Sequence, residues 1–150
     1  MARSMQTTEI IARGVCLYRG HVLLCRNRKH GNVYLPGGHI ESEERAPDAL
    51  RRELDEELGL RCTIGRFLGT IQHAFDQRKH RVVEINFVFV FCLPRASLRQ
   101  APAAAEKKLE FLWWPLKTLT RSGVEPRILA RCLPGWLRGT TKPNRWDSSF

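Results

Sequence analysis

The sequence lacks long apolar runs, paired cysteines and an apolar leader. No stretch approaches the roughly 20 apolar residues of a membrane-spanning helix. The five cysteines are odd in number and scattered, and no two have Cys-x-x-Cys spacing, so neither a disulfide framework nor a zinc site is expected. Residues 1–8 contain no apolar segment of a secretory signal. These absences predict a cytoplasmic protein that does not enter membranes.

Acidic residues are scarce outside one short segment. The chain has 25 Lys and Arg against 15 Asp and Glu, a formal net charge of +10. Residues 41–57 hold eight of the 15 acids and only three bases, whereas the basic excess lies after residue 60. Such an excess favours an anionic partner: a nucleotide polyphosphate, nucleic acid or an acidic membrane surface. Solubility alone is the alternative explanation.

The length of 150 residues predicts one domain, with a core at about 8–135 and a loose polar tail from about residue 139. Residue patterns predict a long loop over 94–105. They also predict strands at 9–18, 21–25, 66–75, 81–92 and 108–114, and helices at 47–58, 115–119 and 126–133. Strands on both sides of one strong helix, with helices at the end, indicate an α/β fold with a mixed β-sheet between helices.

Three carboxylates gather on one side of the expected helix 47–58. At about 100° per residue, Glu53, Glu56 and Glu57 share an arc of roughly 100° beside a leucine stripe. Like charges at this spacing destabilise a helix, and Arg52 alone does not neutralise three carboxylates. A divalent cation such as Mg²⁺ does, because it prefers oxygen ligands. A solvated face with ion pairs to Arg is the alternative.

The acids belong to a longer motif. Gly38 is followed by five residues and Glu44, then by seven residues and the run Arg52-Glu53-Leu54-Asp55-Glu56-Glu57-Leu58-Gly59-Leu60. This pattern resembles the box of the Nudix (MutT-like) hydrolase family, G-x5-E-x7-R-E-U-x-E-E-x-G-U with U apolar, at every fixed position. The segments 34–38 and 110–116 also resemble the strands that flank the box, so the resemblance covers roughly residues 8–135.

The resemblance implies an α/β/α sandwich that hydrolyses a nucleoside diphosphate linked to another group, X. It implies that Glu53, Glu56 and Glu57 bind Mg²⁺ or Mn²⁺, with the Gly38 carbonyl joining them. Arg52 would hold the carboxylates in place through charge-assisted hydrogen bonds. The implied reaction is in-line attack of metal-activated water on one phosphorus.

The general base stays open at this point. Glu56 or Glu57 within the box is one choice, and Glu106 at the end of the long loop is another, with a solvated surface carboxylate as the alternative for Glu106. Glu44, the first Glu of the motif, is expected near the metal or as an anchor of the loop.

Substrate-binding candidates lie outside the box. Glu84 and Asn86 are the polar residues of the apolar run 82–91 and share one strand face. A buried carboxylate needs a partner, so Glu84 indicates either a cleft or a buried salt bridge. His39 and His73 are expected to line the pocket, or else to be structural. Arg26, in a basic loop, either grips phosphates or is solvated.

Several functions fit this pattern. The leading hypothesis is hydrolysis of a nucleoside triphosphate, ADP-ribose or a dinucleoside polyphosphate by a monomer or homodimer. Removal of pyrophosphate from RNA 5′ ends is a second enzymatic hypothesis, supported by the basic excess. A non-catalytic nucleotide sensor is the third, and it normally requires a broken box or a second domain. The box identifies the diphosphate and the metal, and leaves X and the base open.

Overall fold

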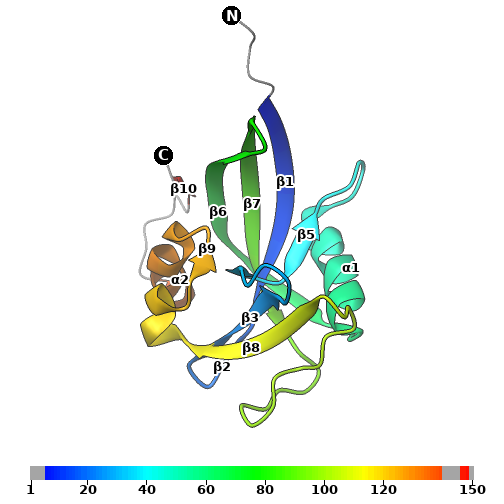
Figure 1. Cartoon of the computed structure of the whole chain (residues 1–150). Coiled ribbons are helices and arrows are strands. Elements are labelled where there is room, and N and C mark those ends of the chain that lie inside the picture. Colours follow the sequence, from blue (N-terminus) through cyan, green and yellow to red (C-terminus); the bar gives the residue numbers. More distant parts are fainter. Residues whose placement is uncertain (1–5, 140–145, 149–150) are drawn as a thin grey trace, which may run out of the picture.

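Two mixed β-sheets form the centre of the computed structural model, which describes residues 6–139 and 146–148. The larger sheet has the strand order β10 (Trp146–Ser148), β6 (Thr63–Gln77), β7 (His80–Cys92), β1 (Gln6–Val15) and β5 (Gly37–His39). The smaller sheet runs β2 (Leu17–Tyr18), β3 (His21–Asn27), β4 (Val33–Tyr34) and β9 (Val124–Glu125), and β8 (Leu109–Pro115) pairs with β3. Helices α1 (Ala46–Leu58) and α2 (Ile128–Arg138) lie on opposite sides of the strands (Figure 1).

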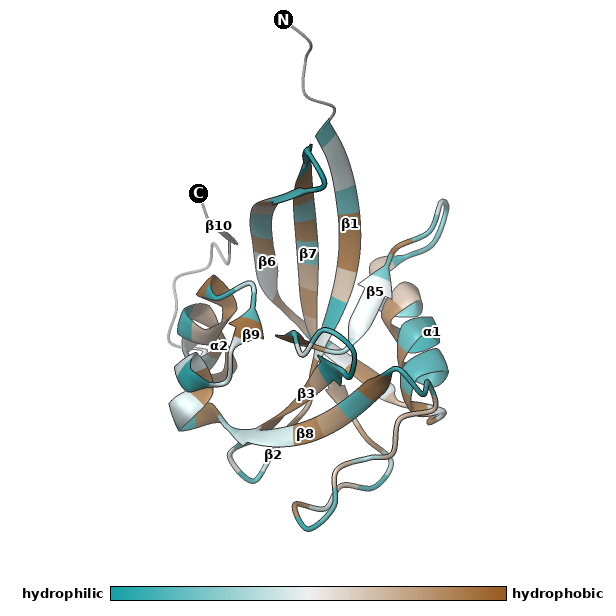
Figure 2. Ribbon diagram, in the orientation of Figure 1, coloured by the Kyte–Doolittle hydropathy of each residue, from teal (hydrophilic) through white to brown (hydrophobic). Residues whose placement is uncertain are grey.

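The predicted α/β fold with a mixed sheet is confirmed. β7 is the central strand of the larger sheet, parallel to β1 and antiparallel to β6. Because its side chains alternate, Val88 joins the hydrophobic cluster on the α2 side, and Phe89 joins the cluster that α1 covers. Figure 2 shows the hydrophobic residues along these strands and the hydrophilic outer face of α1.

The acidic helix begins and ends where the sequence indicates. Pro47 stands in its first turn, where a missing N–H costs nothing. Gly59 ends it in the left-handed conformation at φ 65°, and its N–H donates to the Asp55 carbonyl at 2.8 Å. The buried face carries Leu50, Leu54 and Leu58, which fixes the orientation of the carboxylates beside them.

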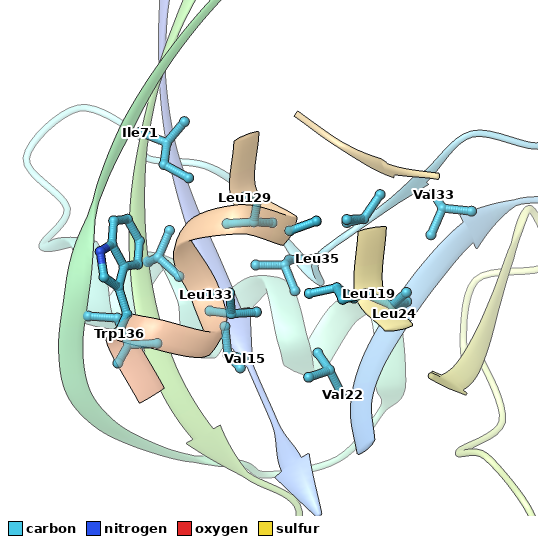
Figure 3. Packing of buried hydrophobic residues seen from close by; sticks show 14 residues of the cluster. Val15, Val22, Leu24, Val33, Leu35, Ile71, Leu119, Leu129, Leu133 and Trp136 are labelled. Atoms are coloured by element: carbon cyan, nitrogen blue, oxygen red, sulfur yellow. The ribbon is translucent and has the colours of Figure 1, made fainter. Parts of the chain in front are cut away.

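The C-terminal part differs from the prediction in three ways. The helix expected at 115–119 is a 3₁₀ helix, η1 (Leu116–Arg121), and α2 begins at Ile128 and continues through Pro134 to Arg138. Burial of Leu133 and Trp136 against β6 and β1 offsets the hydrogen bond that Pro134 cannot make (Figure 3).

The third difference concerns the tail. The expected loose tail is wrong for Trp146–Ser148, because these residues form β10, which pairs in parallel with β6. The rest of that prediction falls on residues 140–145 and 149–150, outside the described residues. Within residues 6–139, no helix is long and apolar enough to span a membrane.

Candidate active site

A double-glycine turn delivers the chain from β4 to β5 and then toward α1. Gly37 has φ 131°, where a side chain is strained, and a Cβ there would overlap the Ala12 carbonyl oxygen. A Cβ on Gly38 would overlap the carboxylate of Glu53. The turn therefore brings the backbone of Gly38 into direct contact with the carboxylate of Glu53, which glycine alone permits.

Glu57 is the buried member of the carboxylate group, with 5% of its surface exposed. Its Oε2 accepts a hydrogen bond from the Gly37 N–H at 3.1 Å. Burial raises the pKa of Glu57 to about 8, and the nearby charges of Glu53 and Glu106 act in the same direction, whereas Gly37 and Arg13 oppose them. A cation placed beside such a carboxylate stabilises its ionised form.

Arg52 holds the other carboxylates. It donates through Nε and Nη2 to both oxygens of Glu44, at 2.9 and 3.0 Å, a bidentate pair. Its Nη1 lies 3.0 Å from Glu53 Oε1 and 3.3 Å from Glu56 Oε1, as expected for i,i+4 spacing. Its Nη2 also donates to the His39 carbonyl at 3.0 Å. Hydrogen bonding to Glu44 is the main reason that the pKa of Arg52 is raised, so the guanidinium stays charged.

The oxygen atoms of this carboxylate group are of the kind that a hard divalent cation prefers. Glu53, Glu56 and Glu57 offer carboxylate oxygens, and the Gly38 backbone lies against Glu53 with no side chain in the way. Among residues 6–139, no three acidic, His or Cys groups already stand at metal-binding spacing. Arg52 bonds to Oε1 of Glu53 and to Oε1 of Glu56, so the second oxygen of each carboxylate can face a cation while Arg52 stays in place.

The long loop after β7 returns to the end of α1. The Ala105 N–H donates to the backbone carbonyl of Glu57 at 2.8 Å. Glu106 follows directly, with Oε2 3.1 Å from Lys108 Nζ, and its charge contributes to the raised pKa of Glu57. The structure thus brings Glu106 to the same carboxylate group as Glu57.

A cleft of about 800 Å³ opens next to this group. One wall comes from β6 and β7, and the other from β9 and the start of α2. The lining residues are His73, Phe75, Gln77 and Glu84 on the first wall, Glu125, Pro126, Arg127, Ile128 and Arg131 on the second, and Arg13, Asn32 and Tyr34 at the end.

Arg13 connects the cleft to the carboxylates. Its Nη1 donates to the carbonyls of Leu35 and Gly37, at 3.1 Å each, and its guanidinium lies 5.2 Å from the centre of the Tyr34 ring. Gly37 also bonds to Glu57, so Arg13, which lines the cleft, and the buried Glu57 share one hydrogen-bonded neighbour. The sequence reasoning missed Arg13, although a charged residue inside the apolar strand 9–18 was a signal for it.

Glu84 lines the cleft and Asn86 lies behind it. Asn86 is 2% exposed, and its Nδ2 donates to Glu84 Oε2 at 3.4 Å and to the Ile71 carbonyl at 3.5 Å. Glu84 has no ion pair with any Arg among the described residues, so the salt-bridge alternative does not describe it. The carboxylate is held toward the cleft by a neutral neighbour.

Three other predicted site residues have different surroundings. His73 lines the cleft and stacks on Phe75, with ring centres 5.5 Å apart. His39 is exposed, and its Nε2 lies 3.2 Å from Glu9 Oε2. Arg26 does not line the cleft: its Nη1 bonds to Glu110 Oε1 at 2.8 Å, across the β3–β8 pair. The phosphate-gripping role assigned to Arg26 therefore has no geometric support, since its guanidinium already has a carboxylate.

The sequence is similar to those of known proteins. The NUDIX domain profile matches residues 8–132. The 8-oxo-dGDP phosphatase NUDT18 of Homo sapiens is 30% identical over 101 residues, which cover 65% of this chain and 29% of that protein. The 8-oxo-dGTP diphosphatase of Proteus vulgaris is 35% identical over 65 residues, 33% of this chain and 58% of that protein.

The fold is also found among solved structures. A NUDIX hydrolase from Nitrosomonas europaea matches with a TM-score of 0.69 and 15% sequence identity, over 91% of this chain and 93% of that one. At this identity the match shows the fold alone. The chain covers less than two thirds of the length of the two curated relatives above.

Proposed function

Because this chain belongs to the NUDIX domain family, we propose that it hydrolyses the diphosphate linkage of a nucleoside diphosphate joined to another group. The observation that supports this most is the hydrogen-bonded connection from Arg13, which lines the cleft, through Gly37 to the buried Glu57. A substrate can lie in the cleft with its diphosphate at the acids. The odd number and scattered positions of the cysteines favour a cytoplasmic location for the reaction.

We assign the cation to the acids of α1. Glu53, Glu56, Glu57 and the Gly38 carbonyl would hold Mg²⁺, or Mn²⁺ in its place. A bound divalent cation neutralises charge on the diphosphate oxygens and lowers the pKa of a water molecule. Arg52 is a positioning residue, because its contacts with Glu44 and the His39 carbonyl anchor it while it holds Glu53 and Glu56.

Glu106 is the proposed general base. Glu56 is bound to Arg52 and Glu57 to the Gly37 N–H, whereas the ion-pair partner of Glu106 among the described residues is the exposed Lys108. Its carboxylate would take the proton of the attacking water beside Glu57. Replacement by Gln removes the acceptor with little change in shape, and a loss of about 10²–10⁴ in kcat is expected for a lost general base.

The nucleoside occupies the cleft in this proposal. The stacked rings of His73 and Phe75 give the wall a flat apolar surface for a base. Glu84, held by Asn86, accepts an N–H of the base edge. Partners are therefore small nucleotides, and the names of the human and Proteus relatives place oxidised guanine nucleotides among the compounds to be tested first.

A substrate panel tests the function. Ordinary and oxidised dNTPs, ADP-ribose, dinucleoside polyphosphates and triphosphorylated RNA are incubated with Mg²⁺, and the products are identified. Turnover is expected on at least one small nucleotide, and it should disappear with a chelator and in Glu56→Gln and Glu57→Gln.

Several outcomes contradict the proposal. Hydrolysis that survives both substitutions, or that needs no metal, contradicts the mechanism. Absence of turnover on every compound, with nucleotide binding retained, favours the sensor, and activity confined to triphosphorylated RNA favours the RNA hypothesis.

A further inference from the structure

We propose that Arg127 and Arg131 form an anion subsite in the cleft, which binds a phosphate monoester that the substrate carries in addition to its diphosphate. The inference rests on the proposed function, because it assumes that the cleft holds the organic part of a diphosphate substrate. It narrows the substrate class to nucleotides with an extra phosphate on that organic part.

The two arginines form an uncompensated pair. Both are exposed and line the cleft, and their spacing of four residues places them on one side of the start of α2. Like charges at this spacing destabilise a helix slightly, and α2 contains no acidic residue to offset them. Within the described residues, neither guanidinium forms a hydrogen bond or an ion pair.

The other charged residues that line the cleft do not form ion pairs with Arg127 or Arg131 in the part of the chain that the structure describes. Glu84 stands on the opposite wall and is bonded to Asn86. Glu125 belongs to β9, in register with Tyr34, and forms no ion pair among the described residues. Arg13 is already engaged with two carbonyls and the Tyr34 ring. Arg127 and Arg131 thus remain the cationic groups of the cleft whose donors are free for a ligand.

The pair lines the cleft, whereas Glu53, Glu56 and Glu57 are not among the residues that line it. The scissile diphosphate must lie at the acids of α1, and α1 and α2 stand on opposite sides of the strands (Figure 1). A cleft of about 800 Å³ accommodates a nucleotide that extends from one side to the other. The arginines would therefore contact the part of the substrate remote from the bond that breaks.

A phosphate monoester suits the pair better than a carboxylate or a neutral sugar. At neutral pH it carries nearly two negative charges and several acceptor oxygens, enough for two guanidinium groups at once. Arginine recognises phosphate through paired, planar donors. The position and charge of the pair thus favour a diphosphate compound with a phosphorylated sugar.

Matched compounds that differ by one phosphate test the subsite. NADPH is compared with NADH, and coenzyme A with its 3′-dephospho form, because each pair shares the same cleavable diphosphate. The wild-type protein should prefer the phosphorylated member of at least one pair by about tenfold or more in kcat/KM. In the double variant R127Q/R131Q this ratio should approach one through a rise in KM, with kcat little changed.

Arg138→Gln is the matched control. It removes an exposed arginine from the last turn of the same helix, outside the cleft lining, and should keep the preference. Thermal unfolding of both variants checks that they fold. Equal kcat/KM for both members of both pairs in the wild type, or a preference unchanged in R127Q/R131Q, overturns the subsite.

Calorimetry separates this proposal from the proposed function. Binding of each pair is measured in chelator, where no turnover occurs. Tighter binding of a phosphorylated member, lost in R127Q/R131Q, supports the subsite even if no compound is hydrolysed. Equal binding, or no binding of any member, overturns it even if other nucleotides are turned over.

Discussion

Glu57 carries the clearest physical conflict of any single residue, because it is a carboxylate buried inside the protein. One backbone N–H, that of Gly37, is its direct hydrogen-bond donor. The conflict makes the residue useful: a group that is costly to ionise alone becomes favourable to ionise beside a cation.

This conflict predicts how the stability of the metal-free protein depends on pH. The ordinary pKa of the carboxyl is 4.5, and burial raises it to about 8 in the folded chain. The folded state therefore binds more protons between these values, so the free energy of unfolding should fall as pH rises from 4.5 to 8, by at most about 1.4 kcal/mol per pH unit. Denaturant unfolding in chelator at several pH values measures it.

Glu57→Gln is the control for this measurement, because it keeps an acceptor for the Gly37 N–H and removes the titration. The slope should flatten in the variant, and Mg²⁺ should restore stability at pH 8 in the wild type alone. If the free energy of unfolding has the same slope against pH in both proteins, Glu57 is not the group that causes the pH dependence.

The two glycines before α1 predict opposite effects of the same substitution. Gly37→Ala strains φ 131° and overlaps the Ala12 backbone, so it should cost about 1–3 kcal/mol of stability. Gly38→Ala meets the movable carboxylate of Glu53, so stability should change little while that carboxylate is displaced. Half-maximal activity should then need about tenfold or more Mg²⁺. Thermal unfolding and metal titration of both variants test these two predictions. Equal losses of stability in the two variants contradict them.

At the scale of elements, the sequence predicts features that depend on a local pattern. It does not predict which residue of another strand a side chain contacts. The limits of α1 follow from Pro47, the leucine stripe and Gly59, which all act within one segment. The partner of Arg26, Glu110, was not predicted because it lies on another strand that no local pattern connects to Arg26. Arg127 was overlooked for the same reason, since only the packing of α2 against the sheet places it in the cleft.

The helix α2 offers a stability prediction of its own. Pro134 lies inside it and cannot donate the hydrogen bond that an interior residue makes. Pro134→Ala restores that donor, and although the unfolded chain gains freedom, a net stabilisation of about 1–2 kcal/mol is expected. Denaturant unfolding measures it, with Pro102→Ala in the exposed loop as a control that should change little. A loss of stability in Pro134→Ala contradicts the expectation.

At the scale of the whole molecule, charge is divided between the two sides of the strands (Figure 1). The acids lie on α1, and part of the basic excess after residue 60 lies on α2, so the sequence order already separated the two signs. The composition predicted an anionic substrate and the motif predicted the acidic site. Neither the composition nor the motif showed which basic residues face the cleft, because that depends on where α2 crosses the sheet.

The hydrogen bond from Ala105 to Glu57 divides the long loop into two parts. This bond ties Ala105 to the last turn of α1. The position of Glu106, the next residue, is therefore set by the helix and not by the loop before it. The exposed stretch 94–100 can then change in length or sequence without moving the proposed base. A single backbone contact thus makes this stretch a site where the chain can diversify while the chemistry is preserved.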